Sequence, residues 1–157
     1  PQLYIAFLGI LRIGAIPVPL FEAFMEEAIA DRLNDSETSL LITSAPFLSR
    51  IQKKLPMILD VQQELLNQPE ECEPTWLNVD DGLVLHYTSG STGKAKGVLH
   101  RQYAMVGHYQ TALWSLDLKP DDIYWCTADP GWVTGTSYGI FGPWLNGITS
   151  LVVEGRF

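Results

Sequence analysis

The sequence is poor in cysteine and in histidine. Its 157 residues include only two cysteines, Cys72 and Cys126, which is too few for the disulfide framework of a small secreted domain. We therefore expect two reduced thiols and a cytoplasmic protein. The three histidines are scattered along the chain without the spacing of a zinc site, so no metal site is predicted.

Basic residues are also few. Lysine and arginine together number 10 against 18 acidic residues, which gives a net charge of −8. Because the phosphates of nucleic acids attract a basic surface, this balance argues against a general nucleic-acid-binding protein. Three of the cations, Lys94, Lys96 and Arg101, lie in or just after one glycine-rich stretch. Such local positive charge is typical of a site for a small anionic ligand.

Long uninterrupted hydrophobic runs are absent as well. The most apolar stretch, LYIAFLGILRIGAIPVPLF, contains Arg12 near its middle and Pro17 and Pro19 in its second half. A charge and two prolines disfavour a membrane span, and the stretch has no signal-peptide pattern. We expect a buried helix followed by a buried strand, and no association with a membrane.

The sequence does have a regular alternation of helical and strand patterns. Helices are expected at residues 1–14, 22–36, 45–55, 100–116 and 135–147. Strands or extended segments are expected at residues 15–20, 39–44, 57–61, 82–88, 122–128 and 148–155, and an acidic loop is expected at residues 62–81. This alternation predicts an α/β fold with a mostly parallel sheet flanked by helices.

The stretch YTSGSTGKAKG, residues 87–97, combines glycines, hydroxyl side chains and two lysines between an expected strand and an expected helix. Glycine lets the main chain approach an anion closely, while hydroxyl and ammonium groups donate hydrogen bonds to phosphate oxygens. The spacing is not that of a Walker A loop, because Gly90 and Gly93 are two residues apart and Ala95 follows Lys94. The Rossmann fingerprint is also absent. The alternative to a phosphate site is a flexible, solvated turn.

The same stretch resembles the signature loop of the adenylate-forming superfamily, which includes acyl-CoA synthetases, luciferases and nonribosomal adenylation domains. Residues 88–93, Lys96 and Gly97 match the motif, and Ala95 stands where a proline is usual. The resemblance implies a phosphate-binding strand–loop–helix unit at residues 83–117. It assigns the ATP phosphates to Thr88, Ser89, Gly90, Ser91, Thr92, Gly93, Lys94 and Lys96.

A second stretch, WCTADPGWVTGTSYGIFGPWLNG, is similar to the segment that lines the acyl and CoA site of acetyl-CoA synthetases. The resemblance implies that residues 123–153 form an acyl and CoA pocket segment. The residues it assigns to the pocket are Trp132, Val133, Thr134, Gly135 and Tyr138. Thr136 stands where many acyl-CoA synthetases have histidine. The alternative is a buried aromatic helix in which these side chains serve only packing.

Taken together, the resemblance covers nearly the whole chain and implies part of the large N-terminal domain of an acetate–CoA ligase. Such an enzyme would use acetate, ATP, CoA and Mg²⁺, and would pass through an acetyl-adenylate. The catalytic lysine of the family lies in a later domain, so no catalytic residue is expected among these 157 residues. We expect the isolated segment to be inactive and prone to self-association. Two alternatives stay open: a ligase for another short acid such as propionate, or a non-catalytic nucleotide- or anion-binding module.

Overall fold

The structure is a computed structural model that describes residues 2–51, 57–60, 68–89 and 93–153. Its helical segments are α1 (Gln2–Arg12), α2 (Glu26–Asp35), the 3-10 helix η1 (Ala45–Arg50), α4 (Ala104–Ser115), α5 (Val133–Thr136), the π-helical η3 (Ser137–Phe141) and α6 (Gly142–Leu145). Its strands are β1 (Leu40–Thr43), β2 (Met57–Asp60), β3 (Gly82–Ser89), β4 (Ala95–Arg101), β5 (Ile123–Tyr124) and β6 (Thr149–Ser150). The mixture of helices and strands confirms the α/β class.

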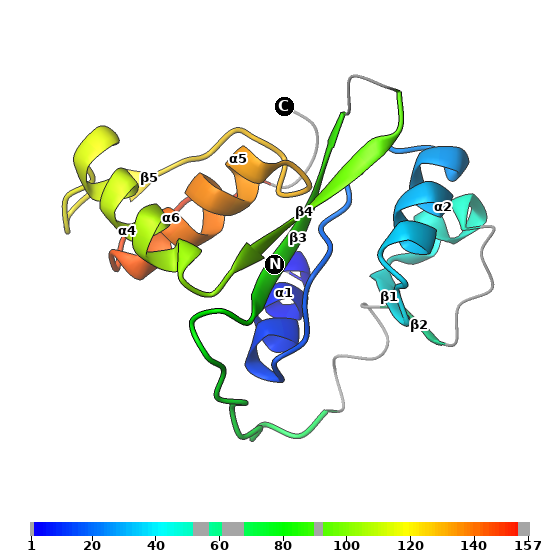
Figure 1. The fold of residues 1–157 in the computed structure, drawn as a ribbon. Helices are drawn as coiled ribbons and strands as arrows, with labels where there is room; N and C mark the ends of the chain where they lie inside the picture. The colour runs from blue at the N-terminus through cyan, green and yellow to red at the C-terminus, as the bar shows by residue number, and fades with distance from the viewer. Residues whose placement is uncertain (1, 52–56, 61–67, 90–92, 154–157) are drawn as a thin grey trace.

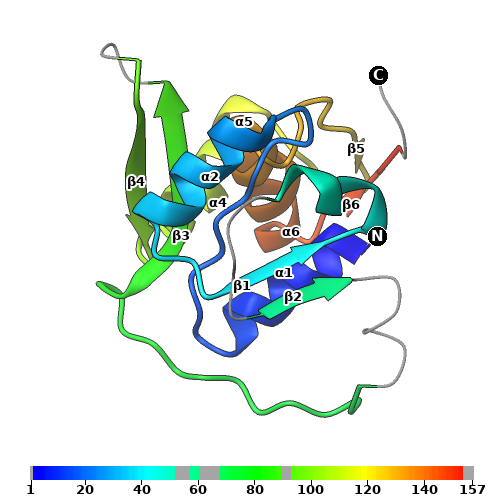
Figure 2. The same ribbon diagram turned by 90° about the vertical axis from the view of Figure 1, so that its right-hand side faces the viewer.

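The described strands pair in three two-stranded sheets. β1 with β2 and β5 with β6 are parallel, as the alternation of helices and strands predicts, whereas β3 and β4 form an antiparallel hairpin. This hairpin stands at the centre of the molecule, with α2 on one side and α4, α5 and α6 on the other (Figure 1). In both views α5 lies closer than α6 to the tip of the hairpin (Figure 2).

The main hydrophobic core joins α1, the hairpin and the last helical segments. It contains Phe7, Leu83, Val84, Ile140 and Phe141, all almost fully buried. The rings of Phe7 and Phe141 meet edge to face with centroids 5.7 Å apart, an arrangement that aromatic pairs favour. One face of β3 is thereby fixed against the helical run that starts at Val133.

Helix α2 and the turn before β5 have smaller cores of their own. Ile29 and Leu33 of α2 pack with Leu20, Phe24, Leu41 and Ile51. A third cluster contains Ala112, Leu118 and Ile148, with Tyr124 and Tyr138 against it. The two sides of the hairpin therefore each have a cluster of buried side chains of their own.

The structure corrects several expected elements. Residues 15–20 form no strand, residues 45–50 form a 3-10 helix, and the first helix, expected to be buried, fully buries only Phe7 among its described residues. The helix predicted at residues 100–116 begins only at Ala104, because Ala95–Arg101 form strand β4. The unit around the signature stretch is thus strand–loop–strand followed by a helix. The main-chain groups of β4 pair with β3 from Ser89 opposite Ala95 down to Gly82 opposite Arg101. Hydrogen bonding to a ready-made strand edge outweighs the weak helical pattern of these residues.

The acidic loop predicted at residues 62–81 is seen from residue 68 onward, where it has no helix or strand. It is attached to the end of α1: Arg12 Nε donates to the Cys72 carbonyl at 2.6 Å, and the Thr75 N–H donates to the Arg12 carbonyl at 2.8 Å. Residues 62–67 of this prediction lie outside the described residues. Within the described ranges, no helix combines the length and the apolar character needed to cross a bilayer.

Candidate functional site

The signature stretch occupies the free end of the β3–β4 hairpin. Thr88 pairs with Lys96 across the ladder, and Ser89 pairs with Ala95. Gly93 has a φ of 85°, a left-handed conformation that favours glycine, so the chain turns there into β4. Gly90, Ser91 and Thr92 of the predicted phosphate site lie outside the described residues.

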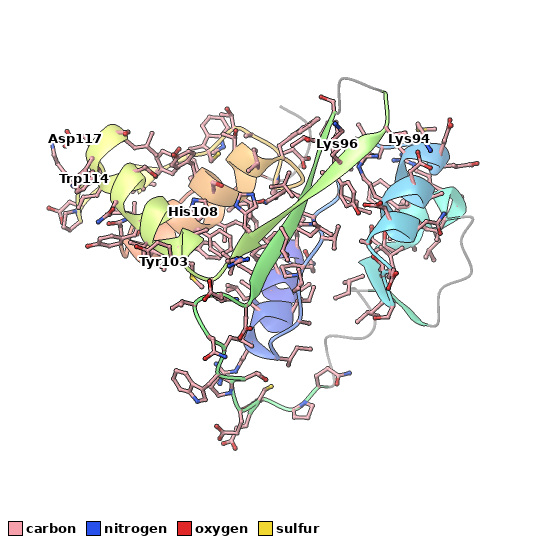
Figure 3. All side chains as sticks on the ribbon, viewed as in Figure 1. Lys94, Lys96, Tyr103, His108, Trp114 and Asp117 are labelled. Carbon is pink, nitrogen blue, oxygen red and sulfur yellow. The ribbon has the colours of Figure 1, made fainter. Side chains whose placement is uncertain are left out.

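The described polar groups of this end face solvent. Thr88, Ser89, Lys94 and Lys96 are all exposed. The two lysines are labelled near the end of the hairpin in Figure 3. Among the described residues, the ion pairs join Arg101 to Asp80 and Lys119 to Asp117, and neither involves Lys94 or Lys96. Two ammonium groups and two hydroxyls are therefore available to an anion at one end of the hairpin.

The residues of β3 just before this end, His86 and Tyr87, are buried. Directly opposite residues in an antiparallel pair share a face, so Tyr87 lies on the same face as Gly97. A side chain at Gly97 would bring its Cβ within 3.1 Å of Leu85 Cδ1 and 3.4 Å of Tyr87 Cε1. The absence of a side chain at Gly97 leaves room for the buried Tyr87 ring. Its phenol donates to Asp35 Oδ2 of α2 at 2.7 Å.

The second predicted segment begins with a tight turn at residues 129–132. Asp129 Oδ1 accepts a hydrogen bond from the Gly131 N–H at 2.7 Å, and the Trp132 N–H donates to the Asp129 carbonyl at 2.9 Å. A Cβ on Gly135 would lie 2.0 Å from the Asp129 carbonyl oxygen, so only glycine permits this close approach. Burial raises the pKa of the Asp129 carboxyl, whereas the hydrogen bond from Gly131 acts against that rise.

Thr136 completes the turn. Its side chain is fully buried, and its hydroxyl donates to the Pro130 carbonyl at 2.8 Å. Thr136 stands where many acyl-CoA synthetases have histidine. Its hydrogen bond connects the start of the helical run to the turn before it. The run continues through a π-helical stretch, in which the Gly142 N–H bonds to the Ser137 carbonyl five residues earlier. Such wide turns are frequent at functional sites.

The predicted pocket residues divide into two groups. Trp132, Val133 and Thr134 are exposed at the start of the helical run, with Trp132 43% and Val133 42% accessible. Gly135 is buried beneath them. Tyr138 lies apart, because its hydroxyl donates to Thr111 of α4 at 3.1 Å and its ring packs on the Ala112 cluster. Its place in an acyl pocket stays a prediction.

The two segments are connected through residues that no sequence motif pointed to. The Arg32 guanidinium lies 4.0 Å from the centre of the Phe24 ring and 5.7 Å from that of Tyr87. Phe24 in turn meets Trp132 edge to face at 6.3 Å. Because Phe24 lies just before α2, Tyr87 on β3 and Trp132 in the turn before α5, only the folded structure brings them together.

The three histidines, which are scattered along the sequence, lie close together in the fold. The rings of His86 and His100 are 5.5 Å apart, those of His100 and His108 are 6.3 Å apart, and His108 stacks on Phe141 at 5.5 Å. The antiparallel register places His86 and His100 on neighbouring positions of one face, opposite α4. In the part of the chain that the structure describes, no cluster of three or more potential ligand side chains could hold a metal ion.

Burial favours the neutral forms of His86 and His108. Burial, with smaller contributions from His100 and His108, lowers the pKa of His86 to about 4. Burial and His100 also lower the pKa of His108. His86 is 3% exposed, and its Nε2 has no hydrogen-bond partner among the described residues. A closely packed column of rings therefore joins the hairpin to α4.

Comparison with known proteins identifies the relatives of this chain. The family model of AMP-binding enzymes matches residues 1–156. An acetyl-coenzyme A synthetase from Bacillus subtilis is 50% identical over an alignment that covers 100% of this chain and 30% of that protein. A second one, from a Marinomonas species, is 39% identical over 99% of this chain and 29% of that protein.

A solved structure agrees with these relatives. The crystal structure of an acyl-CoA synthetase from Brucella canis superimposes with a TM-score of 0.88 and 31% sequence identity, covering 100% of this chain and 32% of the other. The chain thus spans about 30% of the length of the relatives it matches. Because the family model matches nearly every residue, this chain belongs to the AMP-binding enzyme family.

Proposed function

We propose that the full-length protein carrying this sequence is an acetate–CoA ligase that forms acetyl-CoA through an acetyl-adenylate. The observation that carries the proposal is the polar end of the hairpin, where Lys94 and Lys96 accompany the exposed hydroxyls of Thr88 and Ser89. The similarity to acetyl-coenzyme A synthetases supports acetate as the acid.

In this proposal the hairpin end binds the β- and γ-phosphates of ATP. A carboxylate oxygen of acetate attacks the α-phosphorus, and the bond to the bridging oxygen breaks to release pyrophosphate. Acetate needs no general base, since it is already ionised near neutral pH. The residues of this chain contribute positioning and neutralisation of charge, and Gly90, Ser91 and Thr92 are proposed to add to the same phosphate site.

In the second step the thiolate of CoA attacks the carbonyl carbon of acetyl-adenylate, and AMP leaves. We propose that Trp132, Val133 and Thr134 border the acyl group at this stage. Their exposure at the start of the helical run supports the assignment, and Gly135 lets the turn pack closely beneath them. Tyr138 is kept as a more distant member of the same pocket.

Mg²⁺ is proposed to enter with ATP. The described residues offer no carboxylate cluster for a resident ion, which fits a metal held mainly by phosphate oxygens and water. A cytoplasmic location is likewise a proposal, supported by the unpaired thiols of Cys72 and Cys126.

The test is product formation by the purified full-length protein with ATP, Mg²⁺, CoA and a series of acids from acetate to butyrate. The proposal predicts acetyl-CoA and AMP in equal amounts, with the highest kcat/KM for acetate. A higher kcat/KM for propionate would identify a ligase for another short acid. ATP binding without AMP formation from any acid would identify a non-catalytic nucleotide-binding module.

The 157-residue segment alone is expected to make no acetyl-CoA in the same assay. Exposed apolar side chains of α1, including Leu3, Ile5 and Leu8, favour self-association of the isolated segment. Size-exclusion chromatography with light scattering would report that association independently of activity.

A further inference from the structure

Arg32 lies outside both predicted site segments and yet contacts residues leading to each of them. It projects from α2, which stands beside the hairpin on the side away from α4 and α6 (Figure 1). Its guanidinium carbon is 4.0 Å from the Phe24 ring centre and 5.7 Å from the Tyr87 ring centre. Both separations are within the range in which a cation is attracted to an aromatic face.

On the hairpin side, Arg32 reaches the residue that immediately precedes the polar end. Tyr87 is buried, and its ring lies against Gly97, where the absence of a side chain leaves room for it. Its phenol also donates to Asp35, three residues after Arg32 on the same helix. A displacement of the guanidinium therefore acts on the main chain that continues directly into Thr88 and Ser89.

On the other side, Phe24 transmits the position of Arg32 to the exposed pocket residues. Phe24 meets Trp132 with ring centroids 6.3 Å apart, and Phe21 meets Phe24 at 5.6 Å and Trp132 at 5.3 Å. The turn is also fixed at the backbone, because a Cβ on Gly131 would lie 2.4 Å from the Phe21 nitrogen. The aromatic contacts thus run from Arg32 to the residue next to Val133.

The environment of Arg32 differs from that of an arginine held by a salt bridge. Among the described residues it forms no ion pair, and its Nε has no hydrogen-bond partner. One guanidinium nitrogen donates to the Ala28 carbonyl at 2.7 Å. Burial lowers its pKa, while Asp31 and Tyr87 act in the opposite sense, and arginine remains charged throughout the physiological range. Aromatic faces, not a carboxylate, hold this cation in place.

We propose that Arg32 is a positioning residue that links the hairpin end at Tyr87–Ser89 with the pocket turn at Trp132–Thr134. The inference rests on the proposed function, in which the first segment binds ATP phosphates and the second binds the acyl group. Occupation of one segment then changes the affinity of the other for its ligand, and the effect is reciprocal.

The first arm of the test measures structure and needs no activity. Amide hydrogen exchange is followed in the full-length protein and in Arg32→Met, with Arg101→Met as the matched loss of one arginine. Arg101 is exposed and pairs with Asp80 at the opposite end of the hairpin from Lys96. We expect Arg32→Met to accelerate exchange roughly tenfold both at residues 87–89 and at the hydrogen-bonded amides of Trp132 and Thr136. Arg101→Met should leave the exchange rates of both segments unchanged.

Acceleration at only one of the two segments would overturn the inference. If Arg32→Met loses protection throughout the protein, amide exchange is measured in Phe24→Leu instead. This variant removes the ring between Arg32 and Trp132 and keeps the arginine. Acceleration at both segments in Phe24→Leu supports the link, whereas acceleration confined to the turn contradicts it. Arg32→Lys keeps a cation near the rings and is expected to restore part of the protection.

The second arm measures the coupling of the two ligands. The KM for ATP in ATP–pyrophosphate exchange is determined at low and at saturating acetate. We expect the two values to differ about fivefold or more in the wild type and in Arg101→Met, and to become equal in Arg32→Met. Equal values in the wild type, or an undiminished difference in Arg32→Met, would contradict the inference. If the wild type catalyses no exchange with any acid, the proposed function fails, and the amide-exchange arm alone judges the link.

Discussion

The Tyr87 phenol donates a hydrogen bond to Oδ2 of Asp35 at 2.7 Å, across 52 positions in the sequence. This bond attaches the strand that leads into the signature stretch to helix α2. Tyr87 is thus placed by two partners on one helix, Asp35 through its hydroxyl and Arg32 through its ring.

Replacing Tyr87 with phenylalanine keeps the ring and removes the hydroxyl. We expect the free energy of unfolding of the full-length protein to fall by about 1 kcal/mol at pH 7, the usual contribution of one such hydrogen bond. Urea denaturation followed by circular dichroism measures the change. A free energy equal to that of the wild type would show that the bond to Asp35 contributes nothing to stability.

The same substitution should change the response to alkali. Burial, and next the hydrogen bond to Asp35, raise the pKa of Tyr87 to about 12, above its unfolded value near 10. The unfolded chain therefore loses this proton first, so wild-type stability falls as the pH rises from about 10 to 12. Tyr87→Phe lacks that contribution and should lose stability less steeply over the same interval.

Because His86 is buried in its neutral form, we expect the free energy of unfolding to decrease in acid. Its pKa is lowered to about 4 by burial first and then by His100 and His108, whereas an unfolded histidine titrates near 6.5. The unfolded chain gains the proton first, so the stability present above pH 6.5 decreases as the pH falls towards 4.

His86→Leu should make this acid dependence less steep, by at most about 1.4 kcal/mol per pH unit, the value for one proton. The measurement is the urea midpoint of the full-length protein between pH 4 and 7. Part of the slope should remain, because the pKa of His108 is lowered as well. An identical slope in wild type and variant would refute the assignment to His86.

The sequence predicted individual elements better than the contacts between them. The turn at Asn146–Gly147 ends the helical run as expected, with Gly147 at a φ of 71°. Strand β4 was not predicted because residues 95–101 are too few to show a clear strand pattern. A helix was expected there instead, as part of a strand–loop–helix unit. The histidine column was missed with it, since only the pairing of Val84 with His100 brings His86 and His100 together.

Arg32 had no sequence signal at all. Its partners Phe24 and Tyr87 lie 8 and 55 positions away on different elements, and no periodicity connects residues across elements. A family motif describes residues that touch a ligand. It carries no information on the side chains that pack against those residues. These side chains are identified only when the packing of α2 on the hairpin is known.

Close approach of main chains makes Gly135 important for the turn at residues 129–135. Gly135→Ala would place a Cβ 2.0 Å from the Asp129 carbonyl oxygen, so the backbone has to shift. We expect a loss of roughly 2–4 kcal/mol in the free energy of unfolding, the scale of overpacking and strain at a fixed backbone. Thermal unfolding of the full-length protein reports it.

Gly107 on α4 provides the matched control, because nothing lies within 4 Å of a Cβ added there. Gly107→Ala should leave stability unchanged or increase it by up to about 1 kcal/mol, as for glycine in a helix interior. Equal effects of the two alanine substitutions would contradict the tight turn at residues 129–135.

Acyl selectivity should respond to the size of Val133. In Val133→Ala of the full-length protein, the ratio of kcat/KM for butyrate to that for acetate should rise roughly tenfold, because one or two methylenes in an apolar pocket are worth about 1–3 kcal/mol. Val106→Ala on α4 is the control, since Val106 is 44% exposed against 42% for Val133. An unchanged ratio in Val133→Ala would place this residue outside the acyl pocket.

The most direct test of the proposed site is acetate-dependent ATP–pyrophosphate exchange by the full-length protein and two lysine variants. The wild type should exchange at about 1 s⁻¹ or faster, a rate typical of enzymes. Lys96→Ala removes one cation from the hairpin end and should slow exchange roughly ten- to a hundredfold. Lys119→Ala removes an exposed lysine that pairs with Asp117 and should leave the rate unchanged. Exchange at the wild-type rate in Lys96→Ala would contradict a phosphate site at the end of this hairpin.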